Sequence, residues 1–449
     1  NQNNIQDNNC SLDSINSGQF PHCFITGVPQ DVTAYFQNKS DAIHSQSTGS
    51  PYQTALSITL KVENSNHVVT HNSTHNWTGS LCFDERDNLS LGSFTPTHGF
   101  NYITAYINSR NGQVDGYHAN DTIRVTTFAC DSLLHGDYTV GGTNPDFLDM
   151  AEGKASLSYC GIDGPVTFHL RPGTYQDFDF AENYIGQSAT NTITFQGDNR
   201  NTVIVTNNNV DAGTNLFGAV TLVSVNNFRF KNLTLQGNNN ATTRGVVLRG
   251  NGCRNILFEN CNINTYATNT TATTTSFGAG RTVAATTIPD TVIFRNCNFT
   301  GANFGIYYIG NNTRRNQLTV ENCHISTCYR GIQTSYCNTL IQNNHIIQYP
   351  ANTHQNFTGI YTDYTVGADV NNNLVDSVYD AENGIYFKNA TLNNFYIRNN
   401  KVKVGNSNFG IYVGNSKFIH ASSGKSGVVY SSLNDDYYNR YYIGGIHIL

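Results

Sequence analysis

The stretch VIFRNCNFTGANFGIYYIGNNTRRNQLTVENCHI, residues 292–325, contains one short motif twice and a second motif between the two copies. The first motif is apolar-x-Asn-x-x-apolar, with its Asn at Asn296 and Asn322, and the second begins at Gly305. Along the chain the first motif recurs with its Asn at Asn232, Asn260, Asn296, Asn322, Asn343, Asn372 and Asn399, and the second begins at Gly245, Gly305, Gly331, Gly359, Gly384 and Gly410. This internal repeat decides the fold of most of the chain.

Successive repeat asparagines lie 21 to 36 residues apart, which leaves room for short strands and turns in each period. A period of this kind is one coil of a right-handed parallel β-helix. Coils stack at the strand spacing of about 4.8 Å, so equivalent positions form ladders along the axis. Asn tolerates the left-handed turn conformation and its amide can bond to the Asn of the next coil. We therefore expect the seven asparagines to form a structural ladder.

Cysteine follows the ladder Asn in three consecutive repeats, as Cys261, Cys297 and Cys323. Free Cys packs as a small hydrophobe, so these residues predict an internal stack. A disulfide between neighbours in the stack is the alternative, and it requires specific geometry.

One segment before the repeats reads as a helix, residues 145–159, PDFLDMAEGKASLSY. Asn144 and Pro145 form its start signal and Gly161 its stop signal. The strand-like PVTFHLRPGTY follows directly. We expect this helix to cap the open end of a β-helix that spans residues 131–449.

Residues 30–130 read as short alternating strands separated by polar turns, for example at 55–62, 102–107 and 122–127. This spacing favours a β-sandwich. The stretch NSRNGQVDGYHANDT, residues 108–122, resembles the immunoglobulin-like, adhesion-type modules of bacterial surface proteins. Residues 1–29 lie outside that predicted sandwich, and we expect them to form a disulfide loop or a partner strand for another subunit.

The stretches HGDYTVGGTNPDF, CGIDGPVTFHLRPGTYQDFDF and FKNLTLQG are similar to the β-helix module of large Bacteroidota surface proteins exported by the type IX route. The resemblance spans residues 131 to about 420. It implies secretion and a surface or adhesive role, and it implies no chemistry. No type IX sorting domain is visible up to Leu449, so we expect that it has been cleaved or that the chain is part of a longer polypeptide.

The composition excludes several classes of protein. Of the 449 residues only 12% are charged, whereas 63 are Asn and 80 are Ser or Thr. A net charge of −6 offers no basic footprint for nucleic acid. The chain has no run of 18 apolar residues, so we expect no membrane insertion.

Eleven cysteines occur without a Cys-x-x-Cys motif, so they do not read as metal or redox sites. Cys10 with Cys23, and Cys82 with Cys130, are candidates for disulfides in an oxidising compartment. Connectivity stays open at this point. Disulfides in an oxidising compartment lead us to expect that the protein is secreted or extracellular and lies at the cell surface.

Glu259 and Glu321 are the one pair of carboxylates that invites an enzymatic interpretation. They lie two coils apart, and the strand spacing puts them about 9.6 Å from each other. This distance is near the separation of the two catalytic carboxyl groups in inverting glycosidases. Arg295 falls between them and would hold both carboxylates ionised. We favour a surface ladder of alternating charges that begins at Lys231, and we expect no catalytic residue.

Metal and cofactor sites are likewise not expected. Asp177 and Asp179 share one face of a strand, but two carboxylates are too few for calcium. His71 and His75 lie four residues apart in a segment with no helical pattern, so we read them as strand or loop residues.

All five Asp-Ser/Thr pairs of the chain are followed by an aliphatic residue. Such triplets resemble the O-glycosylation signal of Bacteroidota. The hydroxyl residues concerned are Ser14, Thr122, Ser132, Thr291 and Ser377. The alternative is that they are ordinary turn residues.

The sequence thus predicts an all-β protein, an immunoglobulin-like β-sandwich followed by a right-handed parallel β-helix with a capping helix. We expect a non-catalytic, extracellular structural or adhesive protein, a glycosylated fibre subunit that associates end to end or with other surface components or glycans. Three explanations are open for the Tyr-rich tail, residues 427–449: stacking on sugars, a further domain in the native chain, or docking onto another subunit. The alternative function is a polysaccharide-binding or polysaccharide-degrading β-helix.

Overall fold

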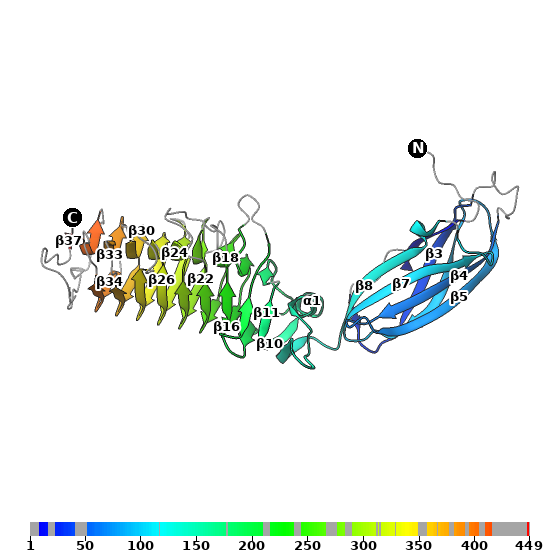
Figure 1. Cartoon of the computed structure of the whole chain (residues 1–449), viewed down its shortest axis with the longest axis horizontal. Coiled ribbons are helices and arrows are strands. Elements are labelled where there is room, and N and C mark those ends of the chain that lie inside the picture. Colours follow the sequence, from blue (N-terminus) through cyan, green and yellow to red (C-terminus); the bar gives the residue numbers. More distant parts are fainter. Residues whose placement is uncertain are drawn as a thin grey trace. The chain divides into compact units, whose positions relative to one another are not determined.

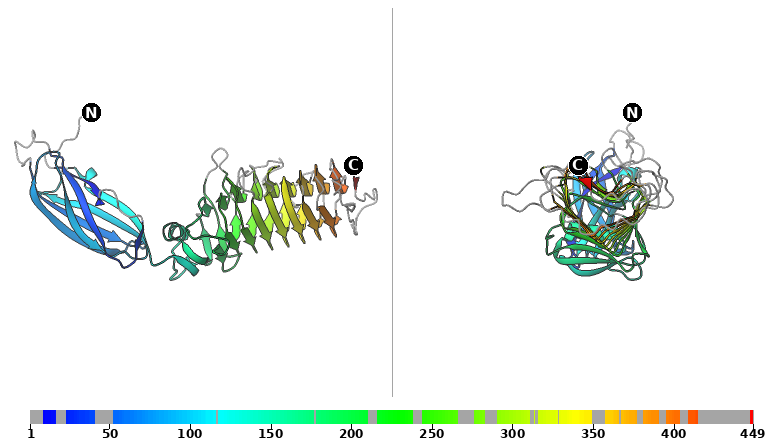
Figure 2. Two further views of the ribbon diagram at one scale, coloured as in Figure 1. Left: turned by 180° about the vertical axis from the view of Figure 1, so that it is seen from behind. Right: turned by 90° about the vertical axis from the view of Figure 1, so that its left-hand side faces the viewer.

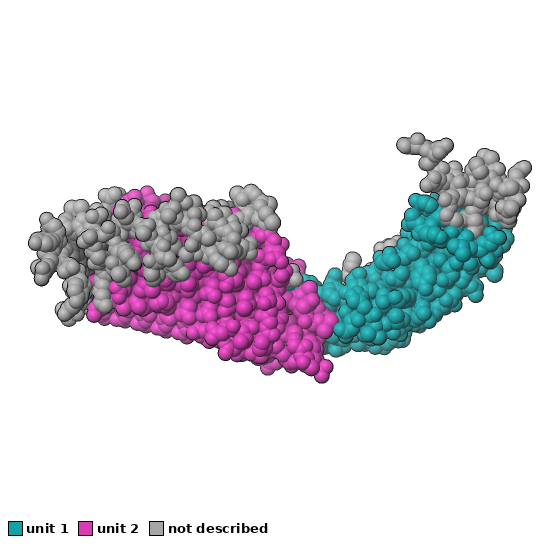
Figure 3. Space-filling view, in the orientation of Figure 1, with its two compact units in different colours: residues 1–134, 154–161 teal, residues 135–153, 162–449 magenta. Residues whose placement is uncertain are grey.

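The computed structural model describes residues 9–16, 23–40, 52–115, 117–176, 178–209, 216–237, 244–265, 276–282, 290–310, 313, 316–327, 329–348, 357–365, 367–376, 381–390, 395–403, 409–414 and 447–448. Within these residues the chain is mostly β-strand with one α-helix, α1 (Met150–Cys160), which confirms the expected all-β class. None of the helices in the described part is long and apolar enough to cross a membrane. The chain forms two compact units, residues 1–134 with 154–161 and residues 135–153 with 162–449 (Figure 3).

Unit 1 is built from two sheets around a shared core (Figure 1). In spatial order the smaller sheet consists of β1 (Cys10–Ile15), β3 (Gln30–Asn38) and β6 (Arg86–Phe94), and the larger of β2 (Cys23–Ile25), β8 (Thr122–Cys130), β7 (Gly99–Arg110), β4 (Gln53–Glu63) and β5 (Val69–Leu81). Alternate residues of both sheets point inward, among them the fully buried Phe36, Leu60 and Ile103. A short 3₁₀ turn, η2 (His118–Asn120), precedes β8.

The segment of residues 1–29 supplies strands to unit 1, which corrects the expectation that it lies outside the sandwich. β1 pairs antiparallel with β3, and β2 pairs parallel with β8. The reason is burial, because Leu12 and Ile15 of β1 lie in the apolar core. The paired part of this segment is therefore used within its own unit.

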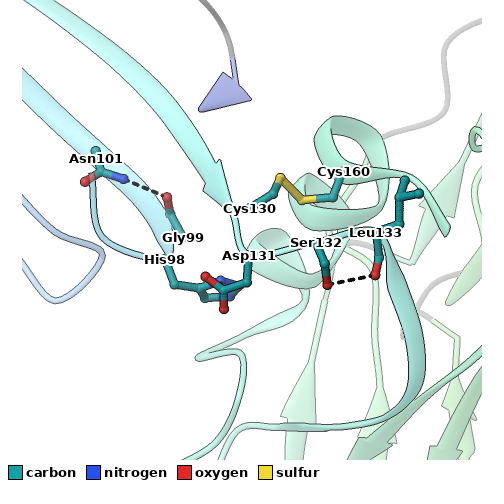
Figure 4. The surroundings of a disulfide bond; sticks show 8 residues. All are labelled: His98, Gly99, Asn101, Cys130, Asp131, Ser132, Leu133 and Cys160. Carbon is teal, nitrogen blue, oxygen red and sulfur yellow. Dashed lines mark hydrogen bonds and ion pairs between the residues drawn. A yellow bond between two sulfur atoms is a disulfide. The ribbon is translucent and has the colours of Figure 1, made fainter. Parts of the chain in front are cut away.

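The disulfide in unit 1 joins Cys130, the last residue of β8, to Cys160, the last residue of α1 (Figure 4). Their Cα atoms are 5.9 Å apart, within the usual range. The expected partner Cys82 is a free, exposed thiol, and Cys10 is free and buried. The side chain of Cys23 lies outside the described residues.

Unit 2 is a right-handed parallel β-helix made of three stacked sheets (Figures 1 and 2). Sheet I consists of β9 (Leu134–Val140), β10 (Ile162–Leu170), β13 (Ile193–Gly197), β16 (Phe228–Lys231), β19 (Ile256–Glu259), β22 (Thr291–Arg295), β25 (Asn316–Glu321), β28 (Cys337–Gln342), β31 (Ala368–Asn371) and β34 (Phe395–Arg398). Sheet II consists of β11 (Gly173–Tyr175), β14 (Val203–Val205), β17 (Thr234–Gln236), β20 (Asn262–Asn264), β23 (Asn298–Thr300), β26 (His324–Thr327), β29 (His345–Gln348), β32 (Leu374–Asp376) and β35 (Lys401–Lys403). Sheet III consists of β12 (Asp179–Phe180), β15 (Val220–Val223), β18 (Arg244–Arg249), β21 (Phe277–Arg281), β24 (Phe304–Ile309), β27 (Arg330–Ser335), β30 (Phe357–Asp363), β33 (Ala381–Lys388), β36 (Phe409–Gly414) and β37 (His447–Ile448).

An internal column of phenylalanines holds successive coils of sheet I in register. Phe168, Phe195, Phe230, Phe258 and Phe294 pair strand to strand and are all fully buried. Their ring centroids follow one another at 5.3, 5.6, 4.8 and 5.1 Å, with nearly parallel planes. A one-residue slip would turn this whole column to solvent, so the register is strongly specified.

The repeat glycine marks a close approach of the chain to the interior of sheet II. A Cβ atom on Gly305 would lie 2.4 Å from Cγ2 of Ile325 and 2.6 Å from the carbonyl oxygen of Gly331. No side chain fits at that separation. This contact explains why the second repeat motif begins with glycine.

The helix begins five residues later than predicted from the sequence. Asp149 is its N-cap, since the N–H of Glu152 donates to Asp149 Oδ1 at 2.9 Å. The Glu152 carboxylate in turn accepts from the N–H of Leu148 at 2.8 Å. In unit 2, Phe147 packs on Phe168 at the start of the phenylalanine column.

Candidate functional site

The outer face of sheet III carries aromatic and arginine side chains in two adjacent columns. The inward residues of its strands are apolar and fully buried, for example Ile306, Ile332 and Ile360. Val247, Gly280, Tyr307, Gln333, Tyr361 and Tyr386 form one outer column, and Arg244, Phe277, Phe304, Arg330 and Thr358 form the other. We call these two columns the arginine–tyrosine face. It extends over several coils in unit 2. Most of its side chains are buried, among them Phe277, Phe304 and Tyr361, whereas Arg330 and Tyr386 are half-buried.

Arg330 is the centre of this face. Its guanidinium carbon lies 4.1 Å from the ring centroid of Tyr361 and 4.8 Å from that of Tyr329. Nη1 donates to Oε1 of Gln333 at 2.6 Å, and Nη2 donates to the Tyr329 hydroxyl at 3.3 Å. Nε is buried and has no hydrogen-bond partner. Cation–π contacts and two hydrogen bonds therefore hold the guanidinium in one orientation.

Aromatic rings continue the face on both sides of Arg330. Phe304 lies 4.9 Å from Tyr307 and meets Tyr329 edge-on at 5.5 Å. Tyr361 meets Tyr386 edge-on at 5.1 Å. Burial raises the pKa of Tyr307, although the charge of Arg330 opposes that shift. The phenol of Tyr307 is therefore neutral.

The charge of two arginines on sheet III is not matched by a carboxylate. Arg249 stacks at 4.7 Å on Phe217, and its Nε and Nη1 are buried without hydrogen-bond partners. Among the residues that the structure describes, neither Arg249 nor Arg330 forms an ion pair with Asp or Glu. A buried guanidinium normally finds a carboxylate or phosphate partner. The face is thus suited to bind an anion.

Glu259 and Glu321 belong to the expected surface ladder of alternating charges. Lys231 Nζ lies 3.1 Å from Glu259, and Arg295 lies 3.5 Å from Glu259 and 2.5 Å from Glu321. Gln342 also donates to Glu321 at 2.9 Å. Burial alone would raise the pKa of Glu321, but the bonds from Arg295 and Gln342 outweigh it and lower that pKa. Neither carboxylate is therefore placed to act as a general acid.

The seven repeat asparagines all lie at the turn between sheets I and II in the left-handed conformation. Their φ angles lie between 53° and 57°. Asn260 donates through Nδ2 to Oδ1 of Asn232 at 2.6 Å, the bond between coils that the ladder requires. Asn260 also accepts a bond from Arg200 at 3.0 Å. In the described coils these residues therefore share one backbone conformation at this turn.

The cysteine column lies next to these asparagines in the interior, as free thiols. Cys261, Cys297 and Cys323 donate to the carbonyl oxygens of Phe230, Phe258 and Phe294 in the preceding coil at 3.5, 3.5 and 3.6 Å. Burial raises the pKa of Cys261 and Cys323. The thiols of Cys261 and Cys323 are therefore protonated and poorly reactive, as structural cysteines are.

Buried asparagines continue this column, which sequence reasoning did not predict. Asn344, Asn373 and Asn400 donate through Nδ2 to Val320, Ile341 and Val370 at 2.9, 2.9 and 2.8 Å. Each Oδ1 accepts a backbone N–H of the preceding coil, at Cys323, Asn344 and Asn373. The Asn-Asn pairs at 343–344, 372–373 and 399–400 were the available signal.

An ion pair inside the β-helix was also missed. Arg281 and Asp290 are 1% and 0% exposed, and the guanidinium holds the carboxylate with two bonds of 2.6 and 3.0 Å. Tyr308 donates to the same carboxylate, and the N–H of Cys253 does so at 2.5 Å. Burial and Asp290 together raise the pKa of Tyr308. All members of this cluster are satisfied, so its role is structural.

The predicted O-glycosylation residues differ in accessibility. Ser132 is exposed, whereas Ser14 and Thr122 are half-buried in strands. Thr291 accepts a bond from the N–H of Asn255 at 2.7 Å. Ser377 lies outside the described residues.

The residues considered as metal ligands are engaged in other bonds. The rings of His71 and His75 both bond to the hydroxyl of Ser73, at 2.8 and 2.9 Å. Asp179 accepts from Asn207 at 2.8 Å, and Asp177 lies outside the described residues. In the described part of the chain, His, Cys, Asp and Glu do not gather in a group of three that suits a metal ion.

The arginine–tyrosine face was not identified from the sequence. The signal was present in the second repeat motif, whose third position is tyrosine in Gly305-Ile306-Tyr307, Gly359-Ile360-Tyr361 and Gly384-Ile385-Tyr386. The isoleucine before each of these tyrosines is buried in the interior, so the tyrosine that follows it points to the opposite, outer face.

Comparisons with known proteins agree with the fold. A family model described as a right handed beta helix region matches residues 285–425. Among solved structures, the chain is similar to the pectate lyase Pel9A, with 12% identity, 64% of this chain and 80% of that chain covered, and a TM-score of 0.38. The chain is also similar to the pectin methylesterase from Aspergillus niger, with 12% identity, 65% of this chain and 92% of that chain covered, and a TM-score of 0.36. A third similar structure is a mannuronic acid specific polysaccharide family 6 lyase from human gut microbiota, with 11% identity, 62% of this chain and 67% of that chain covered, and a TM-score of 0.33. A search of curated proteins finds no match. These similarities show the fold alone.

Proposed function

We propose that this protein is an extracellular adhesive protein that binds an acidic polysaccharide on the arginine–tyrosine face and does not cleave it. The observation that carries the proposal is Arg330. Its guanidinium is held between the rings of Tyr329 and Tyr361, and it has no ion-pair partner among the described residues.

A polysaccharide that contains uronic acids supplies what this face lacks. Sugar rings have apolar C–H surfaces that pack on aromatic faces, and aromatic residues with a polar tip suit such ligands. Guanidinium groups bind carboxylates through parallel hydrogen bonds. Successive strands of the columns lie about 4.8 Å apart along the coil axis, so an extended polymer spans several coils.

The state of Glu259 and Glu321 supports binding without cleavage. Glycoside hydrolysis uses one protonated and one ionised carboxyl group with room for the sugar between them. Arg295 bonds to both carboxylates and occupies that space. Prolonged incubation with the polysaccharide is therefore expected to release no oligosaccharide.

Export and surface attachment are part of the same proposal. The Cys130–Cys160 disulfide supports an oxidising compartment. The exposed Ser132 is the residue that best fits the expected O-glycosylation, and the resemblance to type IX-secreted Bacteroidota surface proteins with immunoglobulin-like modules supports cell-surface display. Assembly into fibres by end-to-end association, or with other surface components, also remains a proposal.

Affinity electrophoresis of the full chain tests the binding. Gels contain polygalacturonate, with dextran as the uncharged control polymer. We expect polygalacturonate to retard the wild type, and Arg330→Gln to weaken binding about 10-fold because a charged hydrogen-bond donor is lost. Arg229→Gln is the matched control, since Arg229 lies on the outer face of sheet I and bonds to Asn255. Equal retardation of wild type and Arg330→Gln would overturn the proposal.

A further inference from the structure

Two tyrosines at the turn from sheet III to sheet I adopt a backbone conformation that tyrosine disfavours. Tyr336 follows β27 with φ 54°, and Tyr364 follows β30 with φ 50°. Their backbone N–H groups bond to the carbonyl oxygens of Asp363 and Lys388 in the next coil, at 3.0 and 3.1 Å. Both residues therefore occupy the same structural position in adjacent coils.

Other coils use residues that suit this turn better. The equivalent left-handed position holds Ser224, Gly250 and Asn389, with φ of 57°, 78° and 50°. Glycine and asparagine enter the left-handed region at low cost, whereas a bulky side chain there is an outlier. Strain of this kind gathers at functional sites.

The two tyrosine rings are stacked face to face. Their centroids are 4.7 Å apart and their planes differ by 4°. Tyr364 is 43% exposed and Tyr336 is half-buried. One aromatic contact returns less free energy than two strained backbones cost, so stability alone does not account for this pair.

A carboxylate next to Tyr364 in the chain is suited to a hydroxyl group of a ligand. Asn389 donates to Asp363 at 3.0 Å, which leaves other lone pairs of that carboxylate available. Asp363 belongs to the outer side of β30, the strand that also carries Tyr361.

We propose that Tyr336 and Tyr364 form a sugar-stacking platform that extends the arginine–tyrosine face around the turn towards sheet I. Its ligand is a pyranose ring of the bound polysaccharide, which stacks on the exposed tyrosine while one of its hydroxyl groups bonds to Asp363. This inference rests on the proposed function, because the ligand is taken to be the same polymer.

Substitution by asparagine tests the platform without adding backbone strain. Asn389 shows that asparagine adopts this turn. For Tyr336→Asn and Tyr364→Asn in the full chain, we expect the affinity for polygalacturonate to fall about 5-fold to 10-fold per ring, from the loss of an aromatic contact. We expect the melting temperature to stay equal or to rise, because strain is relieved. Tyr364→Gly is the third variant, and Tyr52→Asn, at a 46% exposed tyrosine of unit 1, is the control.

The outcomes separate the two proposals. Unchanged affinity in all three platform variants overturns the platform, whether or not the melting temperature falls, and leaves the proposed function in place if Arg330→Gln still loses binding. A wild type that no gel containing polygalacturonate retards overturns the proposed function, and the platform with it. Equal loss of affinity in Tyr52→Asn would also contradict the platform.

Discussion

The guanidinium carbon of Arg330 lies 4.1 Å from the ring centroid of Tyr361, which belongs to the next coil of sheet III. The two residues are 31 positions apart in the chain and meet only because the coils stack in register. The contact places a positive charge on an aromatic surface, and the proposed binding of an acidic polysaccharide depends on this pair.

Lysine at position 330 is expected to bind polygalacturonate with an affinity between that of the wild type and that of Arg330→Gln. Lysine keeps the charge but loses the planar fork that stacks on tyrosine and binds a carboxylate with two bonds. The measurement is the affinity of the three proteins at two salt concentrations. Full wild-type affinity in Arg330→Lys would show that charge alone matters.

Replacement of Asp290 by asparagine is expected to lower the free energy of unfolding by about 3–5 kcal/mol, because it leaves the buried Arg281 without its counter-charge. Urea unfolding of the full chain measures this. Asp163→Asn is the control, since Asp163 pairs with His135 on the surface and should change stability by less than about 1 kcal/mol. Equal effects of the two substitutions would contradict the assigned role of Asp290.

Loss of the Cys130–Cys160 disulfide is expected to lower the stability of unit 1 by about 3–4 kcal/mol, given the sequence separation of 30 between the two cysteines. Cys160→Ser and reduction of the wild type should have the same effect. Cys82→Ser should have none, because Cys82 is a free, exposed thiol. Unfolding of each protein with and without reductant provides the test, and a stabilised or unchanged Cys160→Ser would refute the assignment.

The stability of unit 1 is expected to fall as pH rises through the titration of Asp115. Burial, helped by the neighbouring Asp121, raises the pKa of Asp115 to about 6 from an ordinary value of 3.8. The folded state therefore binds more protons than the unfolded state between these values. The stability contribution is fully present below pH 3.8 and is lost as pH rises through 6, by at most about 3 kcal/mol.

The variant Asp115→Asn isolates this effect, because asparagine does not titrate. The difference in unfolding free energy between wild type and variant should change steadily from pH 4 to pH 6.5. A difference that is constant over this range would show that the carboxyl group of Asp115 does not titrate there.

The repeat architecture is readable from the sequence because one residue per coil carries a strong conformational signal. Asn232 and Asn260 recur where the backbone needs a positive φ, and charges one position earlier alternate in sign because like charges in adjacent parallel strands repel. The repeat period and the residue type are together sufficient to predict such ladders from the sequence.

Contacts between different faces of the coil are not readable in this way. Arg281 and Asp290 are 9 positions apart and form a buried ion pair, yet a lone arginine at the end of a strand gives no sign that it points inward. Likewise, Cys160 lies 30 residues after Cys130, and sequence separation does not reveal that the end of α1 reaches β8.

The arginine–tyrosine face falls between these two cases. The tyrosines recur with the repeat, as at Tyr307 and Tyr361, so their common outer position follows from the period. The arginines do not recur, and only the structure shows Arg330 stacked on rings from two coils. Sequence periodicity therefore does not predict a ligand site whose residues differ from coil to coil, even though the coils themselves repeat.

Hydroxyl-radical footprinting of the full chain with and without polygalacturonate tests the central claim most directly. Oxidation of Tyr329, Tyr386 and Tyr364 should fall several-fold in the presence of the polymer, while the exposed Tyr52 and Tyr159 of unit 1 should stay unchanged. Unaltered oxidation at all three unit 2 tyrosines, or protection confined to unit 1, would contradict binding on the arginine–tyrosine face.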